Sequence, residues 1–273
     1  MATLAGESFL EQHRRDVLSG TPRARFIDRW IFAFMAAWFI AIVLTGFIPD
    51  SLMNLAMIKA HQRAPYPLIT DVHAVLMGSF MLLLLAQTVL VATGRTAIHR
   101  RIGLLGMVLA PALVIVGILV AATNYHTIWQ GAHFGPPPVR VALTPVVALF
   151  ENILLLQLRM GILFSLFLAL SLWARTRDPG FHKRMMILGT AVPLAVALAR
   201  ITWLPEDPHS TLLLDAYVLF AVSPMLVWDI VRNRSLHRAY WVWLPIYIGT
   251  GLAANSVWDT PWWHATARHI MGV

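Results

Sequence analysis

Seven long runs of apolar residues alternate with more polar segments along the chain. A bilayer core about 30 Å thick needs about 20 apolar residues per helix, and within lipid only helices and closed barrels satisfy every backbone hydrogen bond. The ten-residue alternating segments typical of a barrel are missing. We therefore predict an all-α polytopic membrane protein with a seven-transmembrane-helix bundle. The predicted spans are residues 29–48, 72–93, 102–122, 146–174, 183–203, 211–231 and 239–258.

These spans divide the chain into an N-terminal segment, residues 1–28, a single transmembrane domain, residues 29–258, and a C-terminal tail, residues 259–273. No small-residue cleavage pattern follows the first apolar run. We therefore expect that run to be a retained span and not a removed signal peptide.

Basic residues indicate the orientation. Of the 21 Lys and Arg residues, 15 fall in the N-terminal segment and in the connections after spans two, four and six, or directly beside them. Because cytosolic connections are enriched in Lys and Arg, the N-terminus is predicted to be cytosolic and the C-terminus periplasmic in a bacterial inner membrane. Ten of the 11 Trp residues lie near predicted span ends, at the depth that indole rings prefer.

Composition agrees with this class and removes several others. Hydrophobic residues make up 58% of the chain and charged residues 12%, and there is no Cys. The missing Cys excludes disulfides, iron–sulfur clusters and thiolate zinc sites. The net charge of +8 is spread over short clusters between apolar runs, which indicates membrane orientation and not nucleic-acid binding. No phosphate-binding loop with a Lys is present.

The predicted outer connections, residues 49–71 and 123–145, are long and rich in Pro and His. Pro65, Pro67 and the run 136–138 make helix unfavourable there. We expect irregular loops that could cap a cavity.

Histidines recur at one predicted depth. The sequences Ile-His-Arg-Arg around His99 and Phe-His-Lys-Arg around His182 each open an outward-going helix, and in both a Gly follows seven residues after the His. Spans two–three and four–five therefore look like weakly similar hairpins. One interpretation is a simple basic anchor at a helix start. The other is that His99 and His182 bind a cofactor, either a haem b or a divalent metal such as copper or iron.

A helix-starting His with a Gly a few residues on, as in His99 with Gly103 and His73 with Gly78, resembles the two-haem transmembrane cytochrome b family. Residues 70–200 are also similar to a group of uncharacterised bacterial multi-pass membrane proteins that have a His early in one span and His-Arg-Arg opening the next. The first resemblance implies haem ligation. The predicted fourth span has no His, so at most one haem of that type has both ligands, from His99 and His182. The second resemblance implies no activity.

Ionisable residues also gather toward the predicted outer side. His73 and His126 are candidate metal ligands, and the candidate catalytic residues are Glu151, Asp71 and Arg200. Ionisable groups inside a membrane are costly and usually find partners, so we expect Arg200 to pair with Asp215 or Glu151. Ordinary interpretations remain open: Asp71 as a helix cap, Arg200 extending outward to the aqueous boundary, and Glu151 satisfied by structural partners.

Three functions fit this sequence. The first is a membrane redox protein, such as an oxidoreductase, that holds a haem or a metal. It would act in electron transfer or on a quinone or other lipid-soluble molecule. The second is a transporter or binding protein for a small apolar or anionic molecule, without a cofactor. The third is an accessory subunit of a larger membrane complex.

Overall fold

Residues 22–273 are described by a computed structural model, and they form helices with no strand among them. The residues before Pro22 lie outside the described part of the chain, so most of the predicted N-terminal segment is not described. The elements are α2 (Pro22–Lys59), α3 (Leu68–Ala92), α4 (Thr96–Phe134), α5 (Pro137–Leu143), η1 (Thr144–Val146), α6 (Val147–Ala174), α7 (Pro179–Ala191), α8 (Leu194–Leu198), α9 (Leu212–Asn233), α10 (Arg238–Val257) and α11 (Pro261–Met271).

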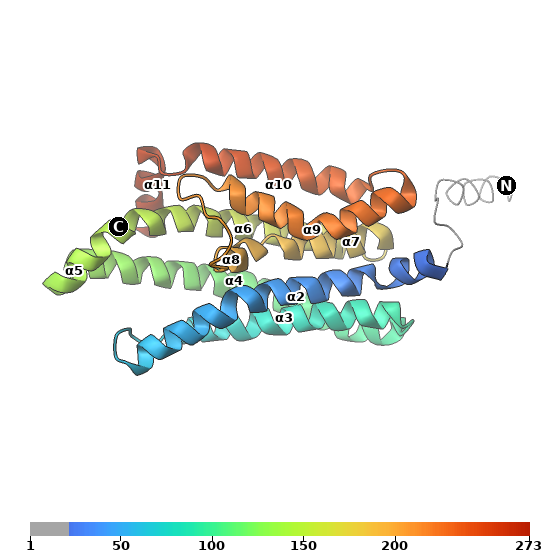
Figure 1. The fold of residues 1–273 in the computed structure, drawn as a ribbon, viewed down its shortest axis with the longest axis horizontal. Helices are drawn as coiled ribbons and strands as arrows, with labels where there is room; N and C mark the ends of the chain where they lie inside the picture. Colours follow the sequence, from blue (N-terminus) through green and yellow to red (C-terminus); the bar gives the residue numbers. More distant parts are fainter. Residues whose placement is uncertain (1–21) are drawn as a thin grey trace.

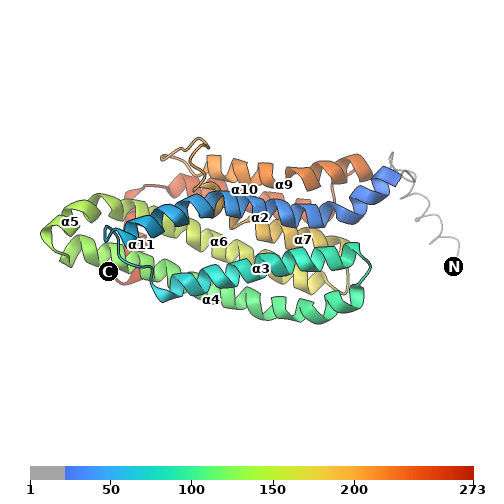
Figure 2. The ribbon, with the colours of Figure 1, turned by 60° about the horizontal axis from the view of Figure 1, so that its bottom comes forward.

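The long helices run side by side and form one elongated bundle (Figure 1). The start of α2 and the C-terminus lie at opposite ends of this bundle. The connections α3–α4, α6–α7 and α9–α10 contain Arg95, Arg175, Arg177 and Arg234, and we call the end where they lie the basic end. The other end carries α5 and α11, and we call it the α11 end (Figures 1 and 2).

By length and composition, six helical segments in the described chain can cross a membrane. They begin at Arg25 in α2, at Leu68, at Thr96, at Pro137, at Pro179 and at Leu212. Large apolar side chains such as Leu82, Val108, Ile162 and Phe220 are exposed on these segments. Such surfaces suit lipid and not water. The protein is therefore an all-α, multi-pass integral membrane protein.

The helices pack in consecutive pairs. α3 contacts α4, α6 contacts α7, and α4 contacts α6, so the two predicted hairpins lie against one another. The main core lies where α2, α6, α7, α9 and α10 meet, and it includes the fully buried side chains of Phe39, Phe167, Met185 and Trp243. α10 belongs to this core along one whole face, although it is not among the six most apolar segments.

The prediction of irregular outer loops was wrong in large part. α2 continues through Pro49 to Lys59, α4 extends to Phe134, and α5 begins at Pro137. Proline at the first position of a helix loses no hydrogen bond, because the N–H it lacks has no partner in the helix anyway. Pro67 and Pro136 likewise stand just before α3 and α5, so these prolines mark helix starts.

The predicted span 183–203 is interrupted. α7 ends at Ala191, and the short α8 follows after Val192 and Pro193. Proline inside a helix removes a hydrogen bond and collides with the preceding turn, which accounts for the break. α8 packs so closely on α2 that a β-carbon at Gly46 would overlap the carbonyl oxygen of Ala197. The break therefore lies inside the protein, where the freed backbone is shielded from lipid.

Candidate functional site

Arg159 lies near the middle of α6, and three groups from α9 and α10 surround its guanidinium. Nη1 donates to Asp215 Oδ1 at 2.7 Å, and Nη2 donates to the Tyr247 carbonyl oxygen at 2.8 Å. Nε donates to Thr250 Oγ1 at 3.2 Å. The Tyr247 hydroxyl donates to the same Asp215 Oδ1 at 2.8 Å. We call Arg159, Asp215 and Tyr247 the central triad. Its two charged side chains are only 10% and 12% exposed.

Gly251 makes room for this ion pair. A β-carbon at Gly251 would overlap Asp215 Oδ2 and would lie 3.0 Å from Arg159 Nη2. Oδ1 of Asp215 accepts both hydrogen bonds, whereas Oδ2 is buried and has no hydrogen-bond partner among the described residues. The aspartate is therefore held through one oxygen only.

A cavity of about 200 Å³ lies beside the central triad. This volume is below the roughly 300–1,000 Å³ typical of sites for drug-sized ligands, so the cavity suits a small molecule. Val192, Ala195 and Val196 line it from the broken segment between α7 and α8. Its polar lining consists of Gln157, Arg159, Arg200, Thr211, Asp215 and Tyr247. Thr211 Oγ1 is buried and, within residues 22–273, has no hydrogen-bond partner.

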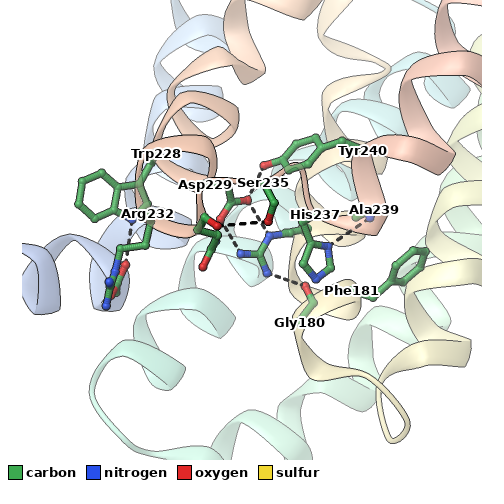
Figure 3. A network of polar contacts seen from close by, with 12 residues as sticks. Gly180, Phe181, Trp228, Asp229, Arg232, Ser235, His237, Ala239 and Tyr240 are labelled. Carbon is green, nitrogen blue, oxygen red and sulfur yellow. Dashed lines mark hydrogen bonds and ion pairs between the residues drawn. The ribbon is translucent and has the colours of Figure 1, made fainter. Parts of the chain in front are cut away.

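A second Arg–Asp–Tyr arrangement lies at the basic end, and Figure 3 shows its Asp229 facing Tyr240 with Gly180 and His237 beside them. Arg184 Nε and Nη2 donate to the two oxygens of Asp229 at 2.6 and 2.5 Å. The Tyr240 hydroxyl donates to Asp229 Oδ2 at 2.7 Å. Arg184 Nη1 donates to the Gly180 carbonyl oxygen at 3.0 Å. We call Arg184, Asp229 and Tyr240 the basic-end triad.

The chain around the basic-end triad is held by two helix caps. The Asp178 carboxylate accepts from the Phe181 N–H at 3.0 Å and pairs with Arg238. Burial alone would raise the pKa of Asp178, but the Phe181 N–H and Arg238 together lower it. His237 Nδ1 accepts from the Ala239 N–H at 3.1 Å at the start of α10. Burial and the neighbouring Arg184 and Arg238 lower the pKa of His237 to about 4.

The two triads follow from helix periodicity. Asp215 and Asp229 are 14 residues apart on α9, and Tyr240 and Tyr247 are seven apart on α10. At about 100° per residue, each pair returns to within about 40° of one helix face. α9 and α10 run in opposite directions, so the first Asp meets the second Tyr. Sequence reasoning missed both triads, since it expected Arg200 and not Arg159 as the partner of Asp215. Paired acids and paired tyrosines on adjacent predicted spans were the available signal.

His99 and His182, the predicted cofactor ligands, lie near the basic end and close enough to affect each other electrostatically. His182 Nδ1 lies 2.9 Å from the Ser171 carbonyl oxygen and 3.0 Å from Ser171 Oγ, while Ser171 Oγ donates to the His182 carbonyl oxygen at 2.9 Å. Nδ1 of His182 therefore carries the proton, which leaves Nε2 with a free lone pair. His99 Nδ1 contacts the Gln87 amide, which can donate through nitrogen or accept through oxygen.

Glu151 is fully buried at the α11 end, and α11 supplies its partners. Arg268 Nε donates to Glu151 Oε1 at 2.7 Å, and His264 Nδ1 lies 2.7 Å from Oε2. The Trp263 indole donates to the Glu151 carbonyl oxygen at 2.8 Å. His264 and Arg268 are four residues apart, so one face of α11 carries both. These contacts attach the C-terminal helix to α6.

The other predicted site residues are not brought together. Asp71 is exposed at the start of α3. His73 lies beside Gly117 of α4, whereas His126 is nine residues further along that helix, about 13 Å away. Arg200 Nε lies 3.5 Å from Asp50 Oδ2, whereas Asp215 pairs with Arg159 and Glu151 with Arg268. The predicted pairing was therefore wrong, although Arg200 and Asp215 line the same cavity. Within residues 22–273 no three His, Asp or Glu side chains form a group that could hold a metal ion.

The chain matches no family model, no curated protein and no solved structure. The function must therefore be argued from the side chains themselves.

We predict that acid destabilises the protein through His237. Its folded pKa of about 4 lies below the ordinary value of 6.5, so the unfolded chain binds the proton more readily. The stability that neutral His237 contributes is complete above pH 6.5 and is lost as the pH falls toward 4. His237→Asn retains a capping oxygen that does not titrate. The melting temperature of the unaltered protein should therefore fall more steeply over this range than that of the variant. Parallel curves would contradict the prediction.

Proposed function

We propose that the protein binds a small monoanion with an apolar body in the cavity beside the central triad, and that it acts as a transporter or binding protein in the membrane. The observation that carries this proposal is the cavity itself, which places Arg159 in contact with an otherwise largely aliphatic lining near the middle of the bundle. Ionisable groups at such a depth are costly and generally mark substrate or ion pathways.

The charges favour an anion over a cation. The lining contains two guanidinium groups, from Arg159 and Arg200, and one carboxylate, from Asp215. Three of the five N–H groups of Arg159 donate to protein acceptors, which leaves one N–H on Nη1 and one on Nη2. Two neighbouring N–H groups can bind both oxygens of one carboxylate. The apolar lining would then hold the body of the ligand.

The interrupted helix supports the same function. Val192, Ala195 and Val196 line the cavity at the break between α7 and α8. Val192 and Pro193 keep right-handed helical dihedral angles, so the break is a local interruption of the hydrogen bonding at Pro193. Interrupted helices that line a cavity form substrate sites in many transporters.

We expect benzoate and benzenesulfonate, but not the neutral benzamide, to raise the melting temperature of the purified protein. At a concentration 100 times the dissociation constant, a ligand stabilises the folded state by about 2.7 kcal/mol, which is a shift of several degrees. Ala195→Leu fills part of the cavity and should abolish the shift. Ala253→Leu, on an exposed face of α10, is the matched control and should retain it. Equal shifts in both variants, or none in the unaltered protein, would exclude the cavity as the site.

A second candidate function, as a haem-binding redox protein, is favoured by one observation at the basic end. A ligating imidazole usually donates its second nitrogen to a carbonyl oxygen, which fixes its orientation, and His182 Nδ1 does so toward Ser171. His99 and His182 would hold the haem iron. Such a haem would carry one electron at a time, with a quinone as a fitting lipid-soluble partner.

An absorption spectrum of the protein purified from haem-supplemented cells tests this candidate. A haem held by two imidazoles should give a Soret band, which His182→Ala should remove. His126→Ala is the control, since His126 lies at the other end of α4 and should leave the band unchanged. Absence of the band together with absence of stoichiometric metal would remove the candidate.

We also propose that α10 is a seventh membrane crossing, with the N-terminus in the cytosol and the C-terminus in the periplasm of a bacterial inner membrane. Its buried face packs within the bundle. The connections that contain Arg95, Arg175, Arg177 and Arg234 lie at the end of the bundle where α2 begins. A reporter active only outside the cytosol should work when fused after Val273 and fail when fused after Arg234. A working fusion at Arg234, or a silent one at Val273, would reverse the assignment.

A further inference from the structure

We infer that the cavity takes its monoanion together with one proton, and that Asp215 is the group that receives the proton. This inference rests on the proposed function and adds to it the coupling of anion binding to proton uptake. The anion would take over part of the pairing of Arg159 that Asp215 now supplies.

The first step of the argument is charge balance. Arg159 and Asp215 form a neutral pair with little exposure to solvent. Arg200, the second guanidinium of the cavity lining, is paired with Asp50, so the four charged groups of these two ion pairs sum to zero. A bound anion would therefore leave one negative charge without compensation. An unbalanced charge in a low-dielectric site is strongly unfavourable, and a carboxylate close to another anion binds a proton more readily. Protonation of Asp215 restores neutrality.

The second step is an asymmetry between the two partners. A guanidinium does not lose its proton in a protein, whereas a carboxylate can gain one. The triad can therefore compensate an added negative charge but not an added positive charge. For this reason the same geometry that admits an anion rejects a cation.

The third step concerns the atom that accepts the proton. Both hydrogen bonds to Asp215, from Arg159 and from Tyr247, end on Oδ1. Oδ2 accepts none from any described residue. A proton on Oδ2 therefore displaces no existing donor, and Tyr247 can continue to donate to Oδ1.

Among the described residues, the charged and titratable groups that contact Asp215 or share its cavity come from three elements. α6 contributes Arg159, and α10 contributes Tyr247. The segment after α8 contributes Arg200 to the cavity, and Asp50 of α2 lies 3.5 Å from Arg200. Arg159 and Arg200 stay charged at all working pH values. Asp50 is half-buried and does not line the cavity, so Asp215 is the acceptor closest to the bound anion.

The experiment counts protons with a probe that cannot carry one. Benzenesulfonate stays ionised throughout the working pH range, so any proton taken up on binding goes to the protein. Calorimetric titrations of the full-length protein in two buffers of different ionisation enthalpy give the number of protons per ligand. We expect one proton to be taken up for each benzenesulfonate bound. Over the pH range in which the free site is deprotonated and the occupied site is protonated, the affinity should fall about tenfold for each unit of rising pH.

Asp215→Asn removes the acceptor while keeping its shape, and it should bind benzenesulfonate with no proton uptake and no pH dependence. Tyr247→Phe, which withdraws a donor from the carboxylate, should retain uptake and move it to higher pH. Tyr247→Phe keeps the Arg159–Asp215 ion pair, so it tests the inference even if Asp215→Asn does not fold.

Binding without proton uptake in the unaltered protein would overturn this inference and leave the proposed function standing. Undiminished uptake in Asp215→Asn, or uptake in Tyr247→Phe that does not move toward higher pH, would also overturn it. No binding of any anion at any pH would instead remove the proposed function itself.

Discussion

Charged groups within an apolar bundle must find partners on other helices, and this constraint fixes how α6, α7, α9 and α10 meet. Removing one partner of a buried ion pair costs about 3–5 kcal/mol, because the remaining charge is left without compensation. Asp215 and Asp229 bind arginines from two different helices, at two depths of the bundle. Each arginine is oriented further by a backbone carbonyl, from Tyr247 or Gly180. The relative rotation of these helices is therefore set by polar contacts as much as by packing.

α10 shows what this arrangement requires of a sequence. Its buried face carries Tyr240, Trp243 and Tyr247, which recur at intervals of three and four residues. The ring centroids of Trp243 and Tyr247 lie 4.5 Å apart in a stacked arrangement. The hydroxyls of Tyr240 and Tyr247 donate to the carboxylates of Asp229 and Asp215 on α9. On the same helix, Gly251 has no side chain, and this leaves room for Asp215 of the central triad. A helix that serves two ion pairs in this way cannot be uniformly apolar, which explains its lower hydropathy.

The two triads differ in their surroundings, and that difference separates structural from functional roles. In the basic-end triad the carboxylate of Asp229 uses both oxygens and is held by three donors, so little remains for a ligand. In the central triad one oxygen of Asp215 is unused, two N–H groups of Arg159 remain, and a cavity adjoins them. The break between α7 and α8 lies at the same place. Incomplete satisfaction beside a cavity is what a binding site requires before its ligand arrives.

The sequence alone determined the class of the protein. Runs of about 20 apolar residues leave helices as the means of satisfying the backbone in lipid, and the boundaries of α3, α6 and α9 were predicted to within a few residues. It could not determine which charges meet, since Arg159 and Asp215 are 56 residues apart and their contact depends on the rotation of three helices. The sequence also did not show what each proline does, because Pro137 begins the helix α5 whereas Pro193 interrupts a helix. Hydropathy is a property of each residue and can be read along the chain, whereas ion pairing and cavities are properties of surfaces that only the packed helices bring together.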